Sequence, residues 1–440
     1  METIMERDLQ LNIIKMIHRE VLPATGCTEP VAVALTVAHA SAILPGEIKS
    51  ITLDLSANIL KNAMGVGIPG TGMIGLPIAI ALGAVIAAPE KELTVLDHFS
   101  EEQFAKAKAL MEAGIITIRL KDGEVDKLYI EATLEDSEGH TAIAIIEKNH
   151  TALKSLTLDG VAQQGQGSHS GQEDEGTTQP YDGPEVPLTF DLVYRFATEM
   201  PLEEIRFIEE AARLNKHASQ YSLKGQYGHS VGRMIKGELG LKYLGDTAYT
   251  RLLASTSAAC DARMDGAPVT VMSNSGSGNQ GITATMPVLT FAEEEGVSEE
   301  KRIRALMLSN LMVIYIKQKL GRLSALCGCV VASTGSACGI TYLMGGTKEQ
   351  IGFAVKNMVG NLTGMICDGA KPSCSLKVTS GVSSAMLSSL LAMEHKVVTS
   401  NEGVVDDDID KSIDNLTSIG RDAMTETDKE VLHIMTHKGK

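Results

Sequence analysis

The chain of 440 residues contains no tryptophan, and aromatic residues make up only 4% of it. Because hydrophobic residues still reach 44%, the core must be built from aliphatic and small side chains, which favours close helix packing. Clusters of basic residues are also missing, and the formal net charge is −16. Phosphate binding needs clustered positive charge, so we expect no nucleic-acid partner. The length itself predicts two domains.

Signals for export and for membrane insertion are lacking too. Residues 1–8 carry acidic side chains and no apolar core, unlike a signal peptide. The longest nearly uncharged run, residues 73–89, is broken by Gly75, Pro77 and Gly83 and is shorter than the roughly 20 apolar residues of a membrane span. This run is predicted to be a buried helix. We expect a cytoplasmic protein without a membrane partner, whose seven cysteines are thiols or ligands rather than disulfides.

Residues 1–160 are predicted to form an α+β domain. Apolar residues at helical spacing predict helices at 9–22 and from Thr28 to about Ser41. A capping box of Ser100 and Gln103 predicts a helix to about Glu112. Alternating patterns predict strands at 51–55, 115–120, 128–134 and 141–146.

The last three predicted strands should form an antiparallel meander. Asp122-Gly123 and Glu138-Gly139 lie between them, and such pairs are typical of hairpin turns. Residues 161–188 are poor in apolar side chains and are predicted to be a flexible linker or loop. Strand signals nearly vanish over residues 189–440, which predicts a mostly helical domain. Its surface, rich in Ala, Gly and Met, would suit a homodimer.

Four cysteines gather in two short segments near the C-terminal end: Cys327, Cys329, Cys367 and Cys374. Soft thiolates suit zinc or an iron–sulfur cluster. The spacing matches neither the paired cysteines of zinc sites nor a ferredoxin run, so a metal site and a set of buried thiols both stay open. Cys260 and Cys338 lie among small helix-forming residues and are interpreted as core.

Cys27 immediately precedes a predicted helix that Thr28 would cap, with Pro30 in the first turn. The unpaired N–H groups and the dipole at such a helix end favour a thiolate, as a base, nucleophile or ligand requires. A cysteine that merely fills space beside the cap explains the position equally well. His229 is a candidate for proton transfer, although a lone histidine is more often structural.

Two glycine-rich loops, residues 65–72 and 275–281, each precede an apolar helix. Their backbone N–H groups could surround an anion such as a carboxylate. Neither loop fits the P-loop or the Rossmann turn, and a tight turn between helices explains each of them as well. Lys61 and Asn62, just before the first loop, could add a cation and an amide.

Four segments taken together carry a family resemblance: residues 25–30, Lys61-Asn62 with 67–70, residues 274–281 and residues 367–371. In this order they resemble the L-cysteine desulfidase family, which is related to the alpha-subunit region of bacterial iron–sulfur L-serine dehydratases. The resemblance runs from Cys27 to about Lys377. Joint occurrence of the segments is far more specific than any one of them.

The resemblance implies a 4Fe-4S cluster held by Cys367, Cys374 and either Cys327 or Cys329, with one iron open to substrate. Cys27 matches a family cysteine proposed to act as the base or to lie beside the substrate. The implied reaction is β-elimination of L-cysteine to pyruvate, ammonia and sulfide. A small amino-acid substrate would then be bound by residues in and beside the two loops: Lys61, Asn62, Gly70, Thr71, Asn274, Ser275 and Asn279.

Three other functions are compatible with parts of the sequence. L-Serine dehydration differs from the first reaction only in the leaving atom. A pyridoxal-phosphate lyase could use residues 275–279 as a phosphate cradle, but it would leave the cysteines without a role. A zinc or redox thiol protein without lyase activity could use the same four cysteines.

Overall fold

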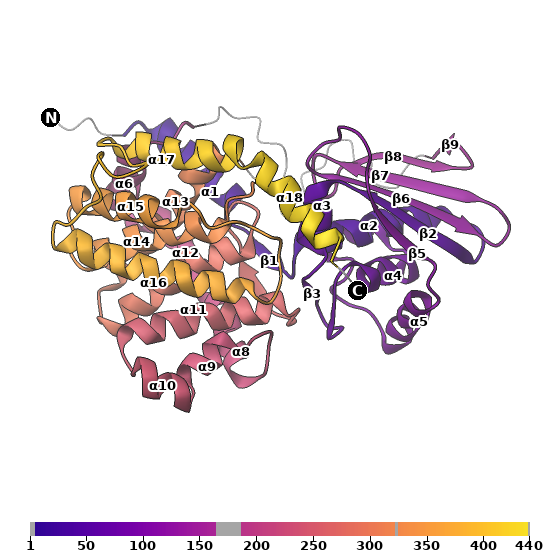
Figure 1. The fold of residues 1–440 in the computed structure, drawn as a ribbon, viewed down its shortest axis with the longest axis horizontal. Helices are drawn as coiled ribbons and strands as arrows, with labels where there is room; N and C mark the ends of the chain where they lie inside the picture. The colour runs from indigo at the N-terminus through magenta and orange to yellow at the C-terminus, as the bar shows by residue number, and fades with distance from the viewer. Residues whose placement is uncertain (1–4, 164–185, 322–323, 439–440) are drawn as a thin grey trace.

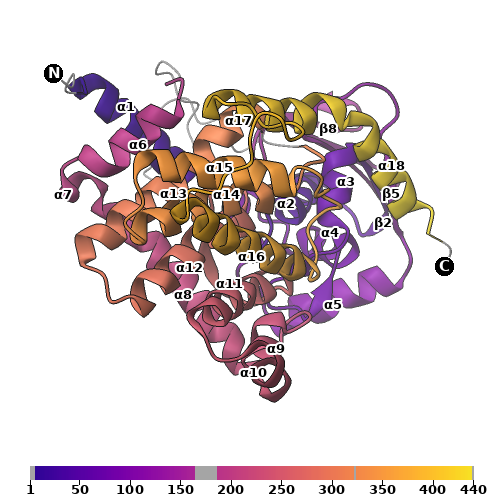
Figure 2. The ribbon, with the colours of Figure 1, turned by 60° about the vertical axis from the view of Figure 1, so that its left-hand side comes forward.

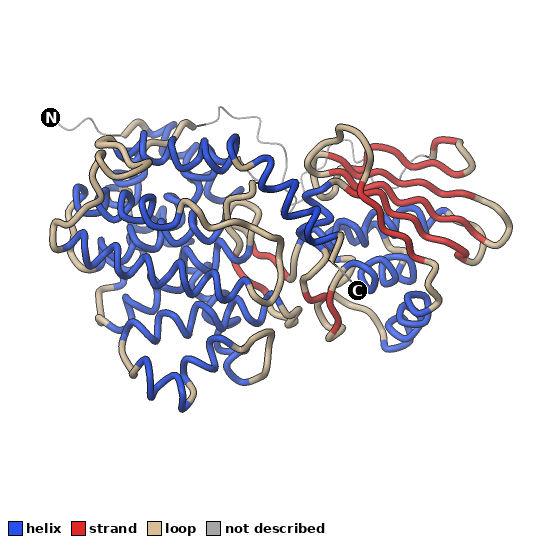
Figure 3. Tube along the Cα trace, viewed as in Figure 1, coloured by secondary structure: helices blue, strands red, loops and turns tan. Residues whose placement is uncertain are grey.

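The computed structural model describes residues 5–163, 186–321 and 324–438. It has a helical domain and a domain built on a sheet, and nearly all the strands belong to the second (Figures 1 and 3). Each domain has a hydrophobic core of its own. The predicted α+β class, with an N-terminal α/β domain and a mostly helical C-terminal domain, is confirmed.

The sheet of the N-terminal domain has the strand order β5-β2-β6-β7-β8-β9. Its strands are β2 (Ile48–Leu55), β5 (Ile116–Leu120), β6 (Tyr129–Asp136), β7 (Thr141–Glu147), β8 (Leu153–Leu158) and β9 (Val161–Ala162). The antiparallel pairing of β6 with β7 confirms the predicted hairpin at Glu138-Gly139, and β8, which was not among the predicted strands, continues the meander. The predicted hairpin at Asp122-Gly123 is wrong, because β5 pairs parallel with β2 at the sheet edge. Helices connect β2 to β5, and such a crossover connection places two strands parallel.

Helices cover one face of this sheet. In β6 the side chains of Ile130, Ala132 and Leu134 are fully buried, as the two-residue period of a strand requires. They face α2 (Thr28–Ile43), on which α4 (Leu76–Ile86) packs. This α4 is the predicted buried helix. The remaining helices are α3 (Ala57–Ala63), η1 (Pro89–Thr94) and α5 (Glu101–Glu112), the last with the predicted capping box.

The centre of the helical domain is α14 (Gly328–Leu343), which contacts α12, α13, α15 and α16. Small residues permit this packing: a Cβ at Gly335 would lie 2.5 Å from the Ser309 carbonyl oxygen. The other longer helices of the domain are α6 (Phe190–Glu199), α8 (Glu209–Lys224), α11 (Ala248–Met264), α12 (Gly278–Glu294), α13 (Glu299–Leu320), α15 (Lys348–Leu362), α16 (Cys374–Met393) and α17 (Ile409–Ser418). Shorter ones are α7 (Leu202–Ile205), η2 (Arg206–Ile208), α9 (Val231–Lys236), α10 (Glu238–Leu244) and η3 (Ile419–Ala423).

Segments from both ends of the chain cross between the domains. The N-terminal helix α1 (Arg7–Glu20) belongs to the core of the helical domain, where β1 (Pro23–Thr25) pairs with β10 (Thr270–Met272). At the other end, α18 (Thr425–Thr436) leaves the helical domain and packs against α3 (Figures 1 and 2). The short hairpin of β3 (Gly67–Ile68) and β4 (Met73–Ile74) also faces the helical domain.

Two further predictions concern a linker and the membrane. The predicted linker at 161–188 lies mostly outside the described residues, with β9 at its start. Within the described chain, α16 is the helix long and apolar enough to cross a membrane, by length and composition alone. It packs against α11, α14 and α15 in the helical domain.

Candidate functional site

A cavity of about 140 Å³ lies where the two domains meet. The N-terminal domain contributes the residues around Cys27 and the helix α3. The helical domain contributes the loop before α12 and the first residues of α14 and α16. Nine of the residues predicted from the sequence line this cavity: Cys27, Lys61, Asn62, Ser275, Asn279, Cys327, Cys329, Cys367 and Cys374.

The four C-terminal cysteines come together because two loops pair. Leu326 and Ile366 form an isolated β-bridge. On either side of it the Cys327 amide donates to Met365 O at 2.9 Å, and the Cys367 amide donates to Ala325 O at 2.6 Å. Cys327 is the N-cap of α14, and Cys374 is the first residue of α16. Two helix N-termini therefore point their unpaired N–H groups at the thiols, which favours negative charge there.

The thiols of this cluster differ in acidity. Cys327 Sγ lies 3.4 Å from Cys329 Sγ. The hydrogen bond between the two thiols lowers the pKa of Cys327 to about 7, although burial opposes the change. Burial raises the pKa of Cys367 and of Cys374. The lysines Lys371 and Lys377 flank the cluster and lower the pKa of Cys327 further.

The donor set fits an iron–sulfur cluster better than a single ion. Among the described residues, no three His, Cys, Asp or Glu side chains are close enough to share one metal ion. The ligands of a cluster stand farther apart than those of one ion, because several irons and sulfides lie between them. Cys327, Cys329, Cys367 and Cys374 line one cavity, Lys371 and Lys377 can balance their charge, and thiolates are the donors that such a cluster takes.

Cys27 is paired with a carboxylate that the sequence did not single out. Its Sγ donates to Glu29 Oε2 at 2.9 Å, and Asn62 Nδ2 donates to Glu29 Oε1 at 3.3 Å. Burial raises the pKa of Cys27, and the Glu29 charge raises it further, so of the two alternatives for this residue the one with a lowered pKa is wrong. Thr28 is also not the cap: it is the first residue of α2, and Cys27 occupies the N-cap without a capping bond from its side chain to the helix backbone.

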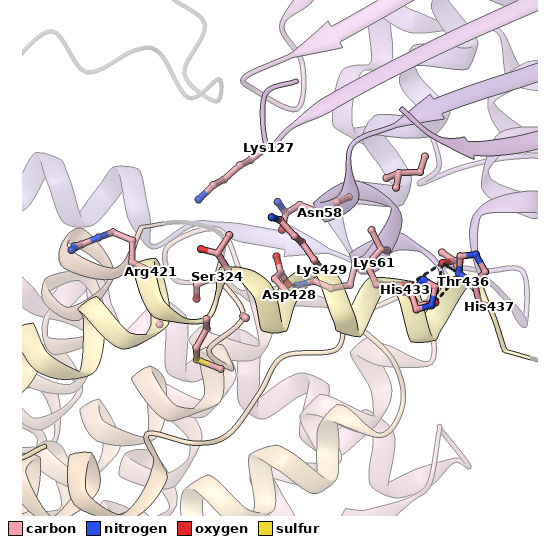
Figure 4. A pocket seen from close by; sticks show the side chains of 17 residues that line it. Asn58, Lys61, Lys127, Ser324, Arg421, Asp428, Lys429, His433, Thr436 and His437 are labelled. Carbon is pink, nitrogen blue, oxygen red and sulfur yellow. Dashed lines mark hydrogen bonds and ion pairs between the residues drawn. The ribbon is translucent and has the colours of Figure 1, made fainter. Parts of the chain in front are cut away.

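Lys61 is 2% exposed and ion-pairs with Asp428 of α18. With Asn58 and Ser324, Lys61 lines both the cavity and a neighbouring pocket of about 360 Å³. Figure 4 shows this second pocket, with Asp428 and Lys429 reaching from α18 toward α3. The Lys61–Asp428 pair thus lies in the wall that separates the two spaces.

The glycine-rich loop before α12 faces the cavity, whereas the loop at 65–72 joins the domains. Ser275 and Asn279 line the cavity, but Asn274 is fully buried and donates to Asn310. In the other loop, a Cβ at Gly67 would lie 2.2 Å from the backbone carbon of Asp265.

Besides Asn274, three predicted site residues lie outside the cavity lining: Gly70, Thr71 and His229. The Gly70 amide donates to Gly266 O at 3.4 Å, and Thr71 Oγ1 donates to Ile68 O at 2.7 Å, so both bonds serve the loop. His229 is exposed, in the turn before α9, and does not line the cavity. Gly70 and Thr71 therefore have a structural role in the loop, and His229 is a surface residue.

Sequence reasoning missed several residues of the cavity wall: Glu29, Asn58, Arg263, Gln280, Lys317 and Lys377. Glu29 has a local signal, because it follows Cys27 by two residues at a helix start. Arg263 lies in the last turn of α11 amid alanines and had no such signal. Only the packing of α11 against α12 brings it to the cavity.

Comparisons with known proteins agree with these observations. A family model described as "Serine dehydratase alpha chain" matches residues 90–433, a range that includes all four cysteines of the cluster. A protein of Porphyromonas gingivalis named "UPF0597 protein" is 63% identical over 434 residues, covering 99% of this chain and 100% of its own. A protein of the same name from Bacteroides thetaiotaomicron is 56% identical over 427 residues, covering 97% and 98%. Another from Photobacterium profundum is 43% identical over 434 residues, covering 99% and 100%.

Proposed function

The chain belongs to the serine dehydratase alpha chain family, and from this premise we propose that it is an iron–sulfur lyase acting on L-cysteine. The products would be pyruvate, ammonia and sulfide. One observation carries the proposal: four cysteine sulfurs and the Cys27–Glu29 pair share a single small cavity. A cavity of this size suits a small amino acid rather than a peptide or nucleotide.

Cys367, Cys374 and one of Cys327 and Cys329 would hold a 4Fe-4S cluster. Such a cluster supplies a Lewis acid that withdraws electron density from the leaving group. Cys327 is the stronger candidate for the third ligand, because its pKa of about 7 makes its thiolate the more available of the two.

The protein's own task is to remove the proton from the α-carbon of the substrate. Cys27 is the proposed base, and Glu29 accepts the thiol proton at 2.9 Å. The resulting thiolate takes the α-proton while the electron pair of that C–H bond expels the β-sulfur as hydrosulfide. Burial and the Glu29 charge raise the pKa of Cys27, so it is a thiol at rest, and the thiolate formed when Glu29 takes its proton is a strong base.

After elimination the remaining chemistry needs no further group. The aminoacrylate takes up a proton to become the imine, and water hydrolyses the imine to pyruvate and ammonia. Backbone donors of residues 275–279 would help to hold the carboxylate during elimination.

L-Serine is the second candidate substrate, because the matching family model is described by that reaction. The same base would take the α-proton, and hydroxide would leave in place of hydrosulfide. Hydroxide is the poorer leaving group, so this reaction depends more strongly on activation at the β-carbon.

The test is release of sulfide and pyruvate from L-cysteine by the chain reconstituted anaerobically with iron and sulfide, with L-serine in parallel. We expect equal amounts of both products from L-cysteine and their loss in Cys367→Ala. Cys338→Ala is the matched control, because Cys338 is fully buried in α14 and does not line the cavity. No product from either amino acid despite full cluster incorporation would refute the lyase. Activity that depends on added pyridoxal phosphate instead of iron would replace it with the pyridoxal mechanism.

A further inference from the structure

Two polar atoms in the wall of the cavity are buried and have no hydrogen-bond partner. Within the described residues, the buried side-chain atoms of this kind are Asp261 Oδ1, Arg263 Nε, Gln280 Oε1 and Thr283 Oγ1. Only Arg263 and Gln280 also line the cavity. One supplies a donor and the other an acceptor. Buried polar groups are normally satisfied, so this complementary pair needs a partner of its own.

The charge of Arg263 is not compensated by its surroundings and would be stabilised by a bound anion. The residue is 5% exposed, and no ion pair to it occurs in the described part of the chain. Nη1 donates to Asn279 Oδ1 at 3.2 Å, which leaves the rest of the guanidinium uncompensated. The group also lies at the N-terminus of α12, where a Cβ on Gly278 would come within 2.2 Å of Nε. The positive end of a helix disfavours a cation, so a bound carboxylate would relieve two unfavourable charges at once.

Gln280 offers the complementary acceptor. It is 4% exposed, and its Nε2 donates to Asn274 O at 3.4 Å. That carbonyl fixes the orientation of the amide, because reversing it would set two oxygens against each other. The free Oε1 of Gln280 lies beside Gly328: a Cβ built on Gly328 would be 3.3 Å from it. This oxygen therefore lies next to the residue between Cys327 and Cys329.

We propose that Arg263 and Gln280 together hold the two charges of a free α-amino acid: the guanidinium binds its carboxylate, and Gln280 Oε1 accepts from its ammonium group. The binding of the amino acid does not depend on the proposed lyase function. The reaction that follows binding rests on that function. The assignment makes the substrate class a zwitterion and excludes hydroxy acids, simple amines and peptides. Asn279 then has a positioning role, since its Oδ1 accepts from Arg263 Nη1 and so orients the guanidinium.

Arg263 and Gln280 are called the clamp below, and the charge of Arg263 acts on the nearby thiol of Cys27. Burial and Glu29 raise the pKa of Cys27, whereas the Arg263 charge opposes them. A substrate held by its carboxylate at Arg263 would therefore place its α-carbon near the proposed base.

The experiment measures binding of L-alanine, which has no leaving group, to the full chain by calorimetry. L-Lactate replaces the ammonium group by a hydroxyl, and ethylamine lacks the carboxylate. We expect the wild type to bind L-alanine and to bind L-lactate and ethylamine much more weakly. Arg263→Gln should weaken L-alanine binding about tenfold to a hundredfold, the range for one hydrogen-bonded charge. Gln280→Leu should weaken it about tenfold, and Gln280→Glu should restore or strengthen it.

Arg304→Gln is the matched control, because Arg304 is also largely buried but pairs with Glu300 outside the cavity. Circular dichroism confirms that each variant is folded. Equal L-alanine affinity in wild type, Arg263→Gln and Gln280→Leu would overturn the clamp, as would a wild type that binds L-lactate equally well. If sulfide is released but L-alanine binding ignores both residues, the lyase stands and the clamp fails. If both residues control L-alanine binding and no product forms, the clamp stands and the lyase fails.

Discussion

At the scale of single residues, the buried carboxyl group of Asp261 near the cavity lowers the stability of the fold when it is ionised. Its side chain is fully buried in α11, two residues before Arg263. Burial raises its pKa to about 6, although the Gly232 amide donates to Oδ2 at 3.0 Å and opposes the change. The other carboxylate oxygen has no partner. Asp261 therefore weakens the fold whenever it is ionised.

We expect the pH dependence of stability to reveal this. The folded pKa is about 6 against an ordinary value of 3.8, so the folded state binds more protons between those values. Stability contributed by the protonated group is complete below about pH 4 and is lost as pH rises through about 6. Relative to wild type, Asp261→Asn should gain up to about 3 kcal/mol in free energy of unfolding between pH 4 and pH 7. Urea unfolding at both pH values checks this, and a difference that stays constant would contradict it.

At the scale of elements, the β3–β4 hairpin is a contact between domains rather than a substrate loop. The backbone at Gly67 approaches the Asp265–Gly266 turn after α11 so closely that no side chain fits. The same turn ends the helix that carries Arg263. The hairpin thus fixes the position of α11 relative to α3, and with it the two walls of the cavity.

Gly67→Ala should destabilise the protein by about 1–3 kcal/mol, because its Cβ would collide with backbone atoms that cannot move aside. Gly364→Ala is the control: Gly364 is exposed, and a Cβ there meets nothing within 4 Å. Its effect should stay within about 0.5 kcal/mol. Free energies of unfolding in urea measure both. A Gly67→Ala variant as stable as the control would show that the hairpin can shift, and that it does not hold the domains in place.

The same elements show what the sequence could predict. The capping box at Ser100 and the buried α4 follow from local patterns, and both are present. The position of β5 in the sheet could not be predicted from local patterns, because the alternating pattern of a strand does not determine which strand it pairs with. The common site of Cys327, Cys329, Cys367 and Cys374 was implied by the family resemblance, because their spacing alone left a metal site and buried thiols both open. Arg263, in contrast, reaches the cavity only through helix packing. The direction of the Cys27 pKa was missed because a helix end was weighed without the burial and Glu29.

At the scale of the whole molecule, an ion pair ties the C-terminal helix α18 to the N-terminal domain. α18 leaves the helical domain and places Asp428 against Lys61 of α3 (Figure 4). Lys61 is almost wholly buried, while the side chain of Asp428 is 24% exposed. The pair therefore closes the wall between the cavity and the outer pocket with charges from opposite ends of the sequence.

Breaking this pair from one side should cost more than removing it altogether. Asp428→Asn leaves the Lys61 ammonium buried without its partner, and we expect a loss of about 2–4 kcal/mol in free energy of unfolding. Lys61→Met removes the buried charge and leaves a carboxylate that solvent partly reaches, so its loss should be smaller. The double variant should recover at least half of the loss caused by Asp428→Asn, because an apolar side chain then fills the site without desolvating a charge. Urea unfolding of the four proteins forms a double-mutant cycle. Additive losses would show that the two side chains act independently and that α18 is held to α3 by its apolar contacts alone.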